Sequence, residues 1–284
     1  MLTILEVITK AAEFLDKKGI ESPRANAEIL LANILNCKRL ELYLMYDRPL
    51  RDSELNIYRE FLKRRSNYEP IQYITGSVEF YALELKVTPA VLIPRPETEI
   101  LVEVIIDSLK KEDELFILDI GSGCGNISIA LAENLPNVHV TGMEISEDAI
   151  MIANENLEKY KLNDRVNFLN GDILKFNVNN FSNYDIIVSN PPYVSQNDYL
   201  NVQNEIKNFE PRIAVTDFSD GYKYFEKIIT LASGILKSGG KLFFEMGQGQ
   251  SKKINELLMK NDYKEINVFK DYQNIDRVIS GVIS

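Results

Sequence analysis

The amino-acid sequence predicts an α/β protein with a mostly parallel, seven-stranded sheet, which follows a small helical bundle and a β-hairpin. Every periodic segment before about residue 68 has helical spacing, and from about residue 115 short apolar segments alternate with helical ones. Two strand-like segments joined by a short turn end the chain. Apolar strands that alternate with helices indicate a parallel sheet covered on both faces. The last two strands are expected to be antiparallel.

The N-terminal residues predict a bundle of four helices. In the first helix, apolar side chains recur at i, i+3 and i+4. The second helix is expected to begin at Ser22-Pro23, with Ser22 as the N-cap and Pro23 as the first helical residue. A short third helix is expected over about 40–46, and a fourth is expected to begin near Ser53.

A change of pattern divides the rest of the chain. Residues 69–92 are rich in β-branched and aromatic side chains and predict a β-hairpin linker. A helix then begins at Pro96, with Glu97 and Glu99 in its first turn, where the helix dipole favours anions. The expected domains are therefore 1–68, 69–92 and 93–284. Strands are expected at 116–120, 138–143, 166–169, 184–189, 241–245, 264–269 and 275–283, and a polar loop at 177–183.

Composition excludes several classes of function. The formal net charge of -10 argues against a general binder of nucleic-acid backbones, which needs an excess of basic side chains. Cys37 and Cys124 lie far apart, so neither a disulfide framework nor a cysteine metal site is expected, and His139 is the only histidine. The sequence contains no long apolar segment, and its first residues are expected to form an amphipathic helix and not a signal peptide. These features predict a cytoplasmic protein.

A glycine-rich turn connects the first strand of the sheet to a helix. Gly121-Ser122-Gly123-Cys124-Gly125 would let the backbone approach a ligand closely. Twenty-one residues after Gly123, at the end of the next strand, Glu144 can accept hydrogen bonds from ribose hydroxyls. A dinucleotide fingerprint would need a third glycine at position 126, where the chain has Asn126. Two alternatives stay open on the turn alone: a dinucleotide site that departs from this fingerprint, and a tight turn without a ligand.

Together with Asp119, this turn resembles the first motif of class I methyltransferases, in which the loop holds the methionine end of S-adenosylmethionine. Asn170-Gly171-Asp172-Ile173 follows the third strand. The resemblance implies that Asp172 contacts the adenine amino group and that Ile173 packs on the ring. A plain β-turn is the alternative, because Asn, Gly and Asp favour turns.

Asn190-Pro191-Pro192-Tyr193 directly follows an apolar strand, at the edge of an open α/β sheet where ligands bind. The motif resembles that of enzymes that methylate a planar, conjugated NH₂ group, either the exocyclic amine of adenine or cytosine or the amide of glutamine. An amide nitrogen is a poor nucleophile because its lone pair is delocalised. The Asn190 side-chain oxygen and the Pro191 carbonyl could orient such a nitrogen, while Tyr193 packs the amide plane. No metal is required.

Further matches extend over nearly the whole chain. Residues 93–99, with the sequence IPRPETE, match the linker signature of the release-factor glutamine methyltransferase family (PrmC/HemK), which the sequence resembles. The predicted bundle and hairpin match the architecture of that family. Its other motifs correspond to Phe209-Glu210-Pro211, Asp220-Gly221, Glu245-Met246-Gly247 with Gln250, and Asp271 with Arg277-Val278.

The resemblance implies a Rossmann-like class I methyltransferase. Its reaction would move a methyl group from S-adenosylmethionine to the N5 nitrogen of the glutamine in the Gly-Gly-Gln motif of class I release factors, leaving S-adenosylhomocysteine. Residues 1–68 would recognise the substrate, and 93–284 would form the methyltransferase domain of a monomer that binds neither membrane nor nucleic acid. The implied cofactor contacts are Asp119, Gly121, Ser122, Gly123, Cys124, Gly125, Glu144, Asp172, Ile173 and Asn190. The implied substrate contacts are Asn190, Pro191, Pro192 and Tyr193, of which Asn190, Pro191 and Tyr193 are catalytic.

Three positions depart from the family pattern. Asn274 stands where glycine is usual, and asparagine tolerates a positive φ. Glu144 replaces a commoner aspartate, and either can bind a ribose. Cys124 replaces serine or threonine and is expected to be a small filler, with a reactive thiol as the alternative.

Three other functions compete with this interpretation. A glutamine methyltransferase of a ribosomal protein would share the glycine-rich turn and the Asn190–Tyr193 motif. An adenine-N6 methyltransferase of nucleic acid would need a basic groove, which the net charge disfavours. A non-catalytic scaffold would be expected to lose Asn190 or the glycines, and both are present.

Overall fold

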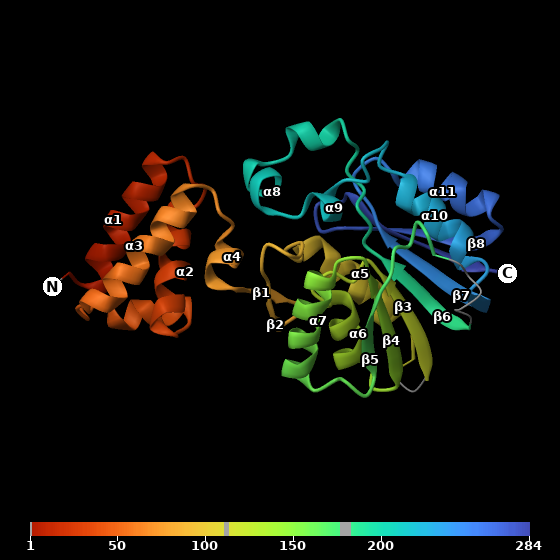
Figure 1. Ribbon diagram of the computed structural model, residues 1–284, viewed down its shortest axis with the longest axis horizontal. Helices are drawn as coiled ribbons and strands as arrows, with labels where there is room; N and C mark the ends of the chain where they lie inside the picture. The colour runs from red at the N-terminus through yellow and green to blue at the C-terminus, as the bar shows by residue number, and fades with distance from the viewer. Residues whose placement is uncertain (1, 111–113, 177–182) are drawn as a thin grey trace. The chain divides into compact units, whose positions relative to one another are not determined.

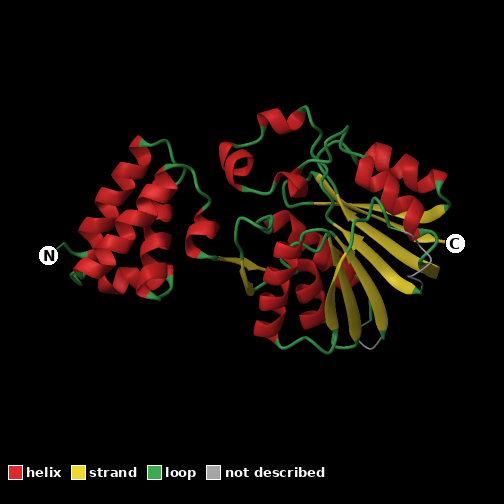
Figure 2. Ribbon diagram, in the orientation of Figure 1, coloured by secondary structure: helices red, strands yellow, loops and turns green. Residues whose placement is uncertain are grey.

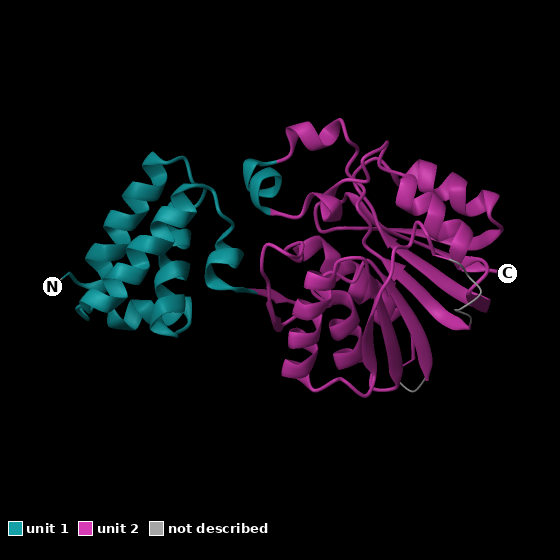
Figure 3. Ribbon diagram, in the orientation of Figure 1, with its two compact units in different colours: residues 1–77, 203–209 teal, residues 78–202, 210–284 magenta. Residues whose placement is uncertain are grey.

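The computed structural model describes residues 2–110, 114–176 and 183–284, and Figure 1 shows the order of the elements along the chain. The chain forms two compact units, which Figure 3 colours separately. The first comprises residues 1–77 and 203–209, and the second 78–202 and 210–284. The domain boundaries expected at 68 and 92 stay predictions. The polar loop expected at 177–183 lies, except for Asn183, outside the described residues.

The first unit is a helical bundle. Its opening helix begins with a capping box, in which the Thr3 backbone N–H donates to Glu6 at 2.8 Å and the Glu6 N–H donates to the Thr3 hydroxyl at 3.4 Å. The apolar faces of the helices meet in a buried core that includes Ile8, Leu30 and Tyr58. The elements are α1 (Ile4–Lys17), α2 (Pro23–Leu35), the 3₁₀ helix η1 (Arg39–Met45), α3 (Asp52–Ser66), α4 (Ile71–Thr75) and α8 (Asn204–Phe209).

Helix α8 comes from a distant part of the sequence but belongs to the first unit. The guanidinium of Arg65, a buried residue on α3, pairs with Glu205 at 2.6 Å. Arg65 also donates to the Asn26 side chain at 2.7 Å and to the Glu69 carbonyl at 2.8 Å. A buried guanidinium needs such partners, because an unpaired charge in the interior is costly.

Helix α2 begins at Pro23 with Ser22 at the N-cap position, as expected, but the Ser22 backbone is left-handed (φ 49°) and its side chain makes no capping hydrogen bond. The Ser22 carbonyl oxygen accepts from the Asn26 N–H and from the Asn26 side chain, both at 3.1 Å. The hairpin is shorter than expected, because Ile71–Thr75 forms helix α4, which ends at Gly76 with φ 80°. Only β1 (Ser77–Phe80) and β2 (Leu83–Lys86) form the hairpin.

The second unit contains the predicted seven-stranded sheet, in the order β5-β4-β3-β6-β7-β9-β8 (Figure 2). The first five strands in this order pair in parallel. Strand β9 is antiparallel to both of its neighbours, which confirms the prediction for the end of the chain. The strands are β3 (Leu115–Ile120), β4 (Val138–Glu144), β5 (Val166–Asn170), β6 (Tyr184–Ser189), β7 (Leu236–Glu245), β8 (Tyr263–Lys270) and β9 (Asp276–Ile283).

Helices cover both faces of this sheet, with α6 and α7 on one face and α10 and α11 on the other (Figure 1). This arrangement explains why the buried residues of β3 and β6 are mostly apolar, since these strands are covered on both sides. No helix among the described residues is long and apolar enough to cross a membrane. The helical elements are α5 (Pro96–Asp107), α6 (Asn126–Asn134), α7 (Glu147–Tyr160), η3 (Asp198–Asn201), α9 (Arg212–Val215), α10 (Lys223–Ala232) and α11 (Ser251–Lys260).

Candidate active site

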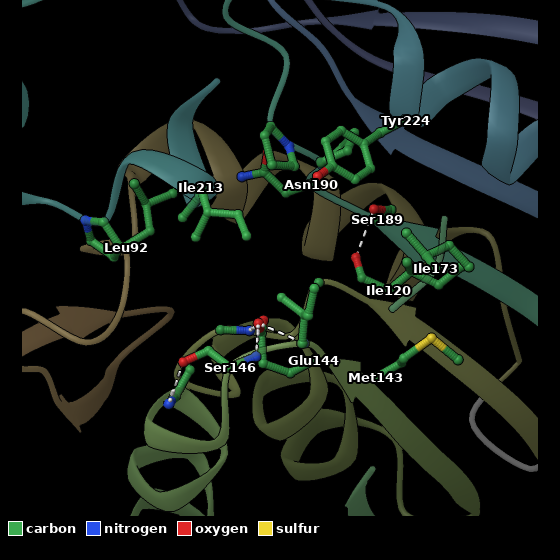
Figure 4. A pocket seen from close by; sticks show the side chains of 18 of the residues that line it. Leu92, Ile120, Met143, Glu144, Ser146, Ile173, Ser189, Asn190, Ile213 and Tyr224 are labelled. Carbon is green, nitrogen blue, oxygen red and sulfur yellow. Dashed lines mark hydrogen bonds between the residues drawn. The ribbon is translucent and has the colours of Figure 1, made fainter. Parts of the chain in front are cut away.

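A pocket lies at the carboxyl ends of β3, β4 and β6, within the second unit. The space between its lining residues amounts to about 880 Å³, including the part that is open to solvent. Figure 4 shows Asn190 and Tyr224 on one side of the pocket and Glu144 and Ser146 on the opposite side. Parallel strands place such a pocket here, because the loops that follow neighbouring strands meet at one edge of the sheet.

The three glycines of the turn after β3 are required for different structural reasons. All three have positive φ, at 78° for Gly121, 55° for Gly123 and 82° for Gly125. A Cβ atom added at Gly121 or Gly123 would meet no atom within 4 Å, so open space faces this stretch of backbone. A Cβ atom at Gly125 would lie 2.8 Å from the Phe168 ring. The first two glycines thus leave room for a ligand, whereas Gly125 lets helix α6 pack closely on the sheet.

We expect Gly125→Ala to destabilise the protein by ~2–4 kcal/mol, because it combines an overpacked contact with left-handed strain. Gly121→Ala is the matched control and should cost only ~1–2 kcal/mol, because it adds strain without a clash. Thermal or urea unfolding of the two variants measures the difference. Equal stabilities would show that Gly125 has no special packing role.

Glu144 organises the loops around the pocket. One of its carboxylate oxygens accepts from the Ile145 and Ser146 backbone N–H groups at 2.8 and 3.0 Å, and the other accepts from the Gly123 N–H at 3.0 Å. The carboxylate therefore connects the end of β4 to the glycine-rich turn. The dashed lines beside Glu144 in Figure 4 mark hydrogen bonds of this carboxylate.

Asp119 and Ser122 each carry a buried oxygen atom without a hydrogen-bond partner among the described residues. The other Asp119 oxygen accepts from the Ser128 hydroxyl at 2.6 Å. Burial raises the pKa of Asp119 to about 7, with a smaller contribution from the negative charge of Glu144 and with hydrogen bonds from Ser128 opposing the rise. Two acidic groups beside an open glycine turn, one of them incompletely bonded, fit a ligand that carries positive charge and hydroxyl donors.

Cys124 is not a reactive thiol. It is 1% exposed, and burial raises its pKa to about 12. A thiol in this environment stays protonated near neutral pH and is a poor nucleophile. The structure therefore favours the expected role of a small filler.

The Asn190–Tyr193 loop is held from behind by a chain of hydrogen bonds. The Asn190 Nδ2 atom donates to Thr98 Oγ1 at 3.1 Å, and that hydroxyl donates to Glu245 Oε2 at 2.5 Å. The Tyr193 hydroxyl donates to Glu245 Oε1 at 3.1 Å. Gln250 also fastens the loop, because its Nε2 atom donates to the Tyr193 carbonyl at 3.1 Å.

The structure brings most of the predicted site residues together around one pocket. The predicted residues that line it are Gly121, Gly123, Glu144, Asp172, Ile173, Asn190, Pro191 and Pro192. Tyr193 is not among the described lining residues, and its hydroxyl points to Glu245. Asp119, Ser122, Cys124 and Gly125 lie in or next to the turn behind the lining. The roles of all these residues stay predictions.

Sequence reasoning missed several residues of the site. Leu92 and Ile213 lie at one end of the pocket, and Tyr224 lies beside Asn190 (Figure 4). Ile213 belongs to α9, which directly follows the Phe209-Glu210-Pro211 motif, so that motif was the available signal. Thr98 stands between Glu97 and Glu99, and nothing in its sequence neighbourhood distinguishes it.

Other residues noted in the sequence have structural partners. Arg95 pairs with the buried carboxylate of Glu210 and is not among the described lining residues. His139 stacks on Phe116, with ring centroids 5.4 Å apart. Asn274 has a φ of 65°, and its N–H donates to the Asp271 carbonyl at 2.9 Å, so the turn expected at this position is confirmed.

Comparisons with known proteins find matches for both the N-terminal and the C-terminal part of the chain. Residues 6–76 match the PrmC N-terminal domain, and residues 111–275 match a methyltransferase domain. A release factor glutamine methyltransferase of Fusobacterium nucleatum is 40% identical over 97% of this chain and 77% of that protein. Another, of Rhodopirellula baltica, is 37% identical over 98% and 95%. A solved methyltransferase structure from Pyrococcus furiosus shares the fold, with a TM-score of 0.50, 21% identity, and coverage of 72% of this chain and 90% of that one.

Proposed function

The chain belongs to the release factor glutamine methyltransferase family, and on that premise we propose which donor and which acceptor its pocket serves. The donor is S-adenosylmethionine. The acceptor is the side-chain N5 nitrogen of the glutamine in the Gly-Gly-Gln motif of class I peptide chain release factors. The observation that carries this proposal is the position of Asn190, whose carboxamide lines a pocket beside an open glycine turn.

The residues of the pocket suit the proposed donor. S-adenosylmethionine, when bound, supplies a methyl group activated by a positively charged sulfur. Glu144 would accept from the ribose hydroxyls, and Asp172 and Ile173 would hold the adenine between polar and apolar contacts. The open space at Gly121 and Gly123 admits a ligand close to the backbone. Asp119 lies behind the glycine turn with one unpartnered oxygen, and a cation in the pocket would favour its ionised form.

The Asn190–Tyr193 loop suits an amide acceptor. Because Asn190 Nδ2 already donates to Thr98, the Oδ1 atom is the group that Asn190 offers to a substrate N–H. The Pro191 carbonyl would accept from the second N–H. Two fixed acceptors orient the nitrogen, and the prolines keep them in place before the substrate arrives. After the new bond forms, the acceptor nitrogen passes one proton to water, so no buried general base is required for the attack itself.

We expect cofactor binding to release up to one proton near neutral pH. The raised pKa of Asp119, about 7, leaves this carboxyl largely protonated at pH 6 in the free protein. A cation in the pocket favours the ionised form and lowers that pKa, so the affinity should rise as the pH increases toward 7 and then level off. Calorimetric titration at pH 6.5 in buffers with different ionisation enthalpies measures the protons released.

Asp119→Asn is the variant that checks the source of the proton. This change keeps the shape of the side chain but cannot ionise, so the proton release should disappear. Unchanged release in Asp119→Asn would assign the proton to another group.

One experiment distinguishes the proposed acceptor from the competing ones. Labelled S-adenosylmethionine is incubated with the enzyme and, separately, a purified release factor, a ribosomal protein extract or duplex DNA. We expect label on the release factor alone. Label on a ribosomal protein would move the substrate to the other class of glutamine methyltransferase, and label on DNA would overturn the inference from the net charge of -10.

A further inference from the structure

We propose that Thr98 and Glu245 are positioning residues that decide which atom of the Asn190 carboxamide faces the acceptor. This inference deepens the proposed function and rests on it. Thr98 lies in the first turn of α5 and Glu245 at the end of β7, so two elements far apart in the sequence meet behind the Asn190–Tyr193 loop. Neither residue lines the described pocket, and both act through Asn190 or Tyr193.

The direction of the hydrogen bonds follows from the chemistry of the groups. Glu245 accepts one hydrogen bond on each oxygen, from Thr98 and from Tyr193, and in this arrangement the carboxylate has no proton to donate. A threonine hydroxyl has a single proton, and Thr98 gives it to Glu245. Thr98 can therefore only accept from Asn190, which must turn its Nδ2 toward Thr98 and its Oδ1 away from it.

A hydrogen-bond partner must fix the orientation of the Asn190 carboxamide, because the shape of the asparagine side chain does not. The oxygen and the nitrogen of a carboxamide have nearly the same size, so rotation by 180° changes the hydrogen bonding but hardly changes the packing. A rotated Asn190 would direct N–H groups at the N–H groups of a substrate amide. It would also offer donors to a carboxylate, so the same rotation would weaken discrimination between glutamine and glutamate.

The burial of Glu245 and Thr98 strengthens the hydrogen bonds that orient the Asn190 carboxamide. Glu245 is 1% exposed and Thr98 is 2% exposed, so water does not compete for these hydrogen bonds. Burial raises the pKa of Glu245, whereas the hydrogen bonds from Thr98 and Tyr193 and the nearby charge of Arg277 lower it, and Glu97 adds a small opposing effect. Losing one partner would leave a buried group unsatisfied, which costs more than the bond itself.

Four variants test the proposal through steady-state kinetics on a release factor. Thr98→Val keeps the shape of the side chain but cannot accept a hydrogen bond from Asn190. Glu245→Gln introduces a donor, which allows every hydrogen bond between Glu245, Thr98 and Asn190 to reverse its direction. We expect each to lower kcat ~10-fold or more, while the cofactor Kd stays within ~3-fold. Thr98→Ser retains the hydroxyl and should keep kcat within ~3-fold of the wild type. The double variant Thr98→Val/Glu245→Gln should lower kcat no more than the worse of the two single variants, because both residues act through one series of hydrogen bonds.

Tyr263→Phe is a matched control for the loss of a buried hydrogen bond. Tyr263 lies on β8, none of whose residues line the described pocket. Its hydroxyl donates to the Ile229 carbonyl at 3.2 Å. Its kcat should equal that of the wild type, even if its melting temperature falls. A low kcat in this control would show that any buried hydrogen bond matters equally and would overturn the specific role of Thr98 and Glu245.

A second readout does not depend on activity. In protein labelled with ¹⁵N-asparagine, Asn190→Ala identifies the Asn190 side-chain resonance, and exchange of its amide protons with water can then be measured. We expect one of the two protons to exchange slowly in the wild type and in Thr98→Ser, and rapidly in Thr98→Val. If the wild type labels no release factor but shows this pattern, the proposed function fails and the orientation stands. If the wild type is active and Thr98→Val changes neither kcat nor proton exchange, the positioning role is wrong.

Discussion

Asn190→Ala is expected to lower kcat by ~100-fold or more, the effect of removing one preorganised polar group that acts on the reacting atoms. The cofactor Kd should change by less than ~3-fold, because the carboxamide is proposed to act mainly on the acceptor nitrogen. Single-turnover methyl transfer at saturating cofactor, together with calorimetric binding, separates the two quantities.

Asn261→Ala is a suitable control for this change. The Asn261 side chain donates to the Leu257 carbonyl at 2.9 Å at the end of α11, and it is not among the residues that line the pocket. This variant should retain full activity. Near-normal turnover in Asn190→Ala would contradict the proposed mechanism, since no other described residue of the loop offers the same acceptor.

Glu144→Ala is expected to have the second largest effect, and it should act on cofactor binding. Loss of hydrogen bonds between a carboxylate and ribose hydroxyls should raise the cofactor Kd ~10- to 100-fold. The change also removes the acceptor for the Gly123, Ile145 and Ser146 N–H groups, so the glycine turn becomes less ordered. Titration calorimetry measures the Kd directly.

Glu147→Ala provides the matched control, because Glu147 is an exposed acid in the first turn of α7 and does not line the pocket. Its Kd should match that of the wild type, which shows that the effect at Glu144 is not one of net charge. An unchanged Kd in Glu144→Ala, with a collapse of kcat, would show that Glu144 does not bind the ribose.

Strong local patterns explain why the sheet could be predicted. Strands β3 and β6 are short segments whose buried residues are mostly apolar, as expected for strands covered on both faces of a sheet. The helix that begins at Pro96 was also predictable, since proline at the first helical position fits its fixed φ. Where a local signal was ambiguous, the tertiary structure decided. Ile71–Thr75 has β-branched and aromatic side chains typical of a strand, but it forms helix α4 in the bundle.

The site was predictable where its residues form a pattern that is uncommon outside ligand-binding sites. Gly121 and Gly123 follow a strand and precede a helix, and Glu144 ends the next strand, so topology alone places them at one edge. Thr98 could not be found in this way. Its role depends on contact with Glu245, which lies 147 positions later in the sequence, and a threonine beside two acidic residues has no distinctive pattern of its own. Ile213 was missed for a similar reason, because one turn of helix gives little periodicity to read.

The most direct test of the central claim locates the methyl group on the substrate. A purified release factor and its variant with alanine in place of the glutamine of Gly-Gly-Gln are treated with enzyme and S-adenosylmethionine, digested, and analysed by tandem mass spectrometry. We expect one added methyl group on that glutamine side chain, none on the alanine variant, and almost none with Asn190→Ala. A methyl group on another residue, or equal methylation of the alanine variant, would contradict it.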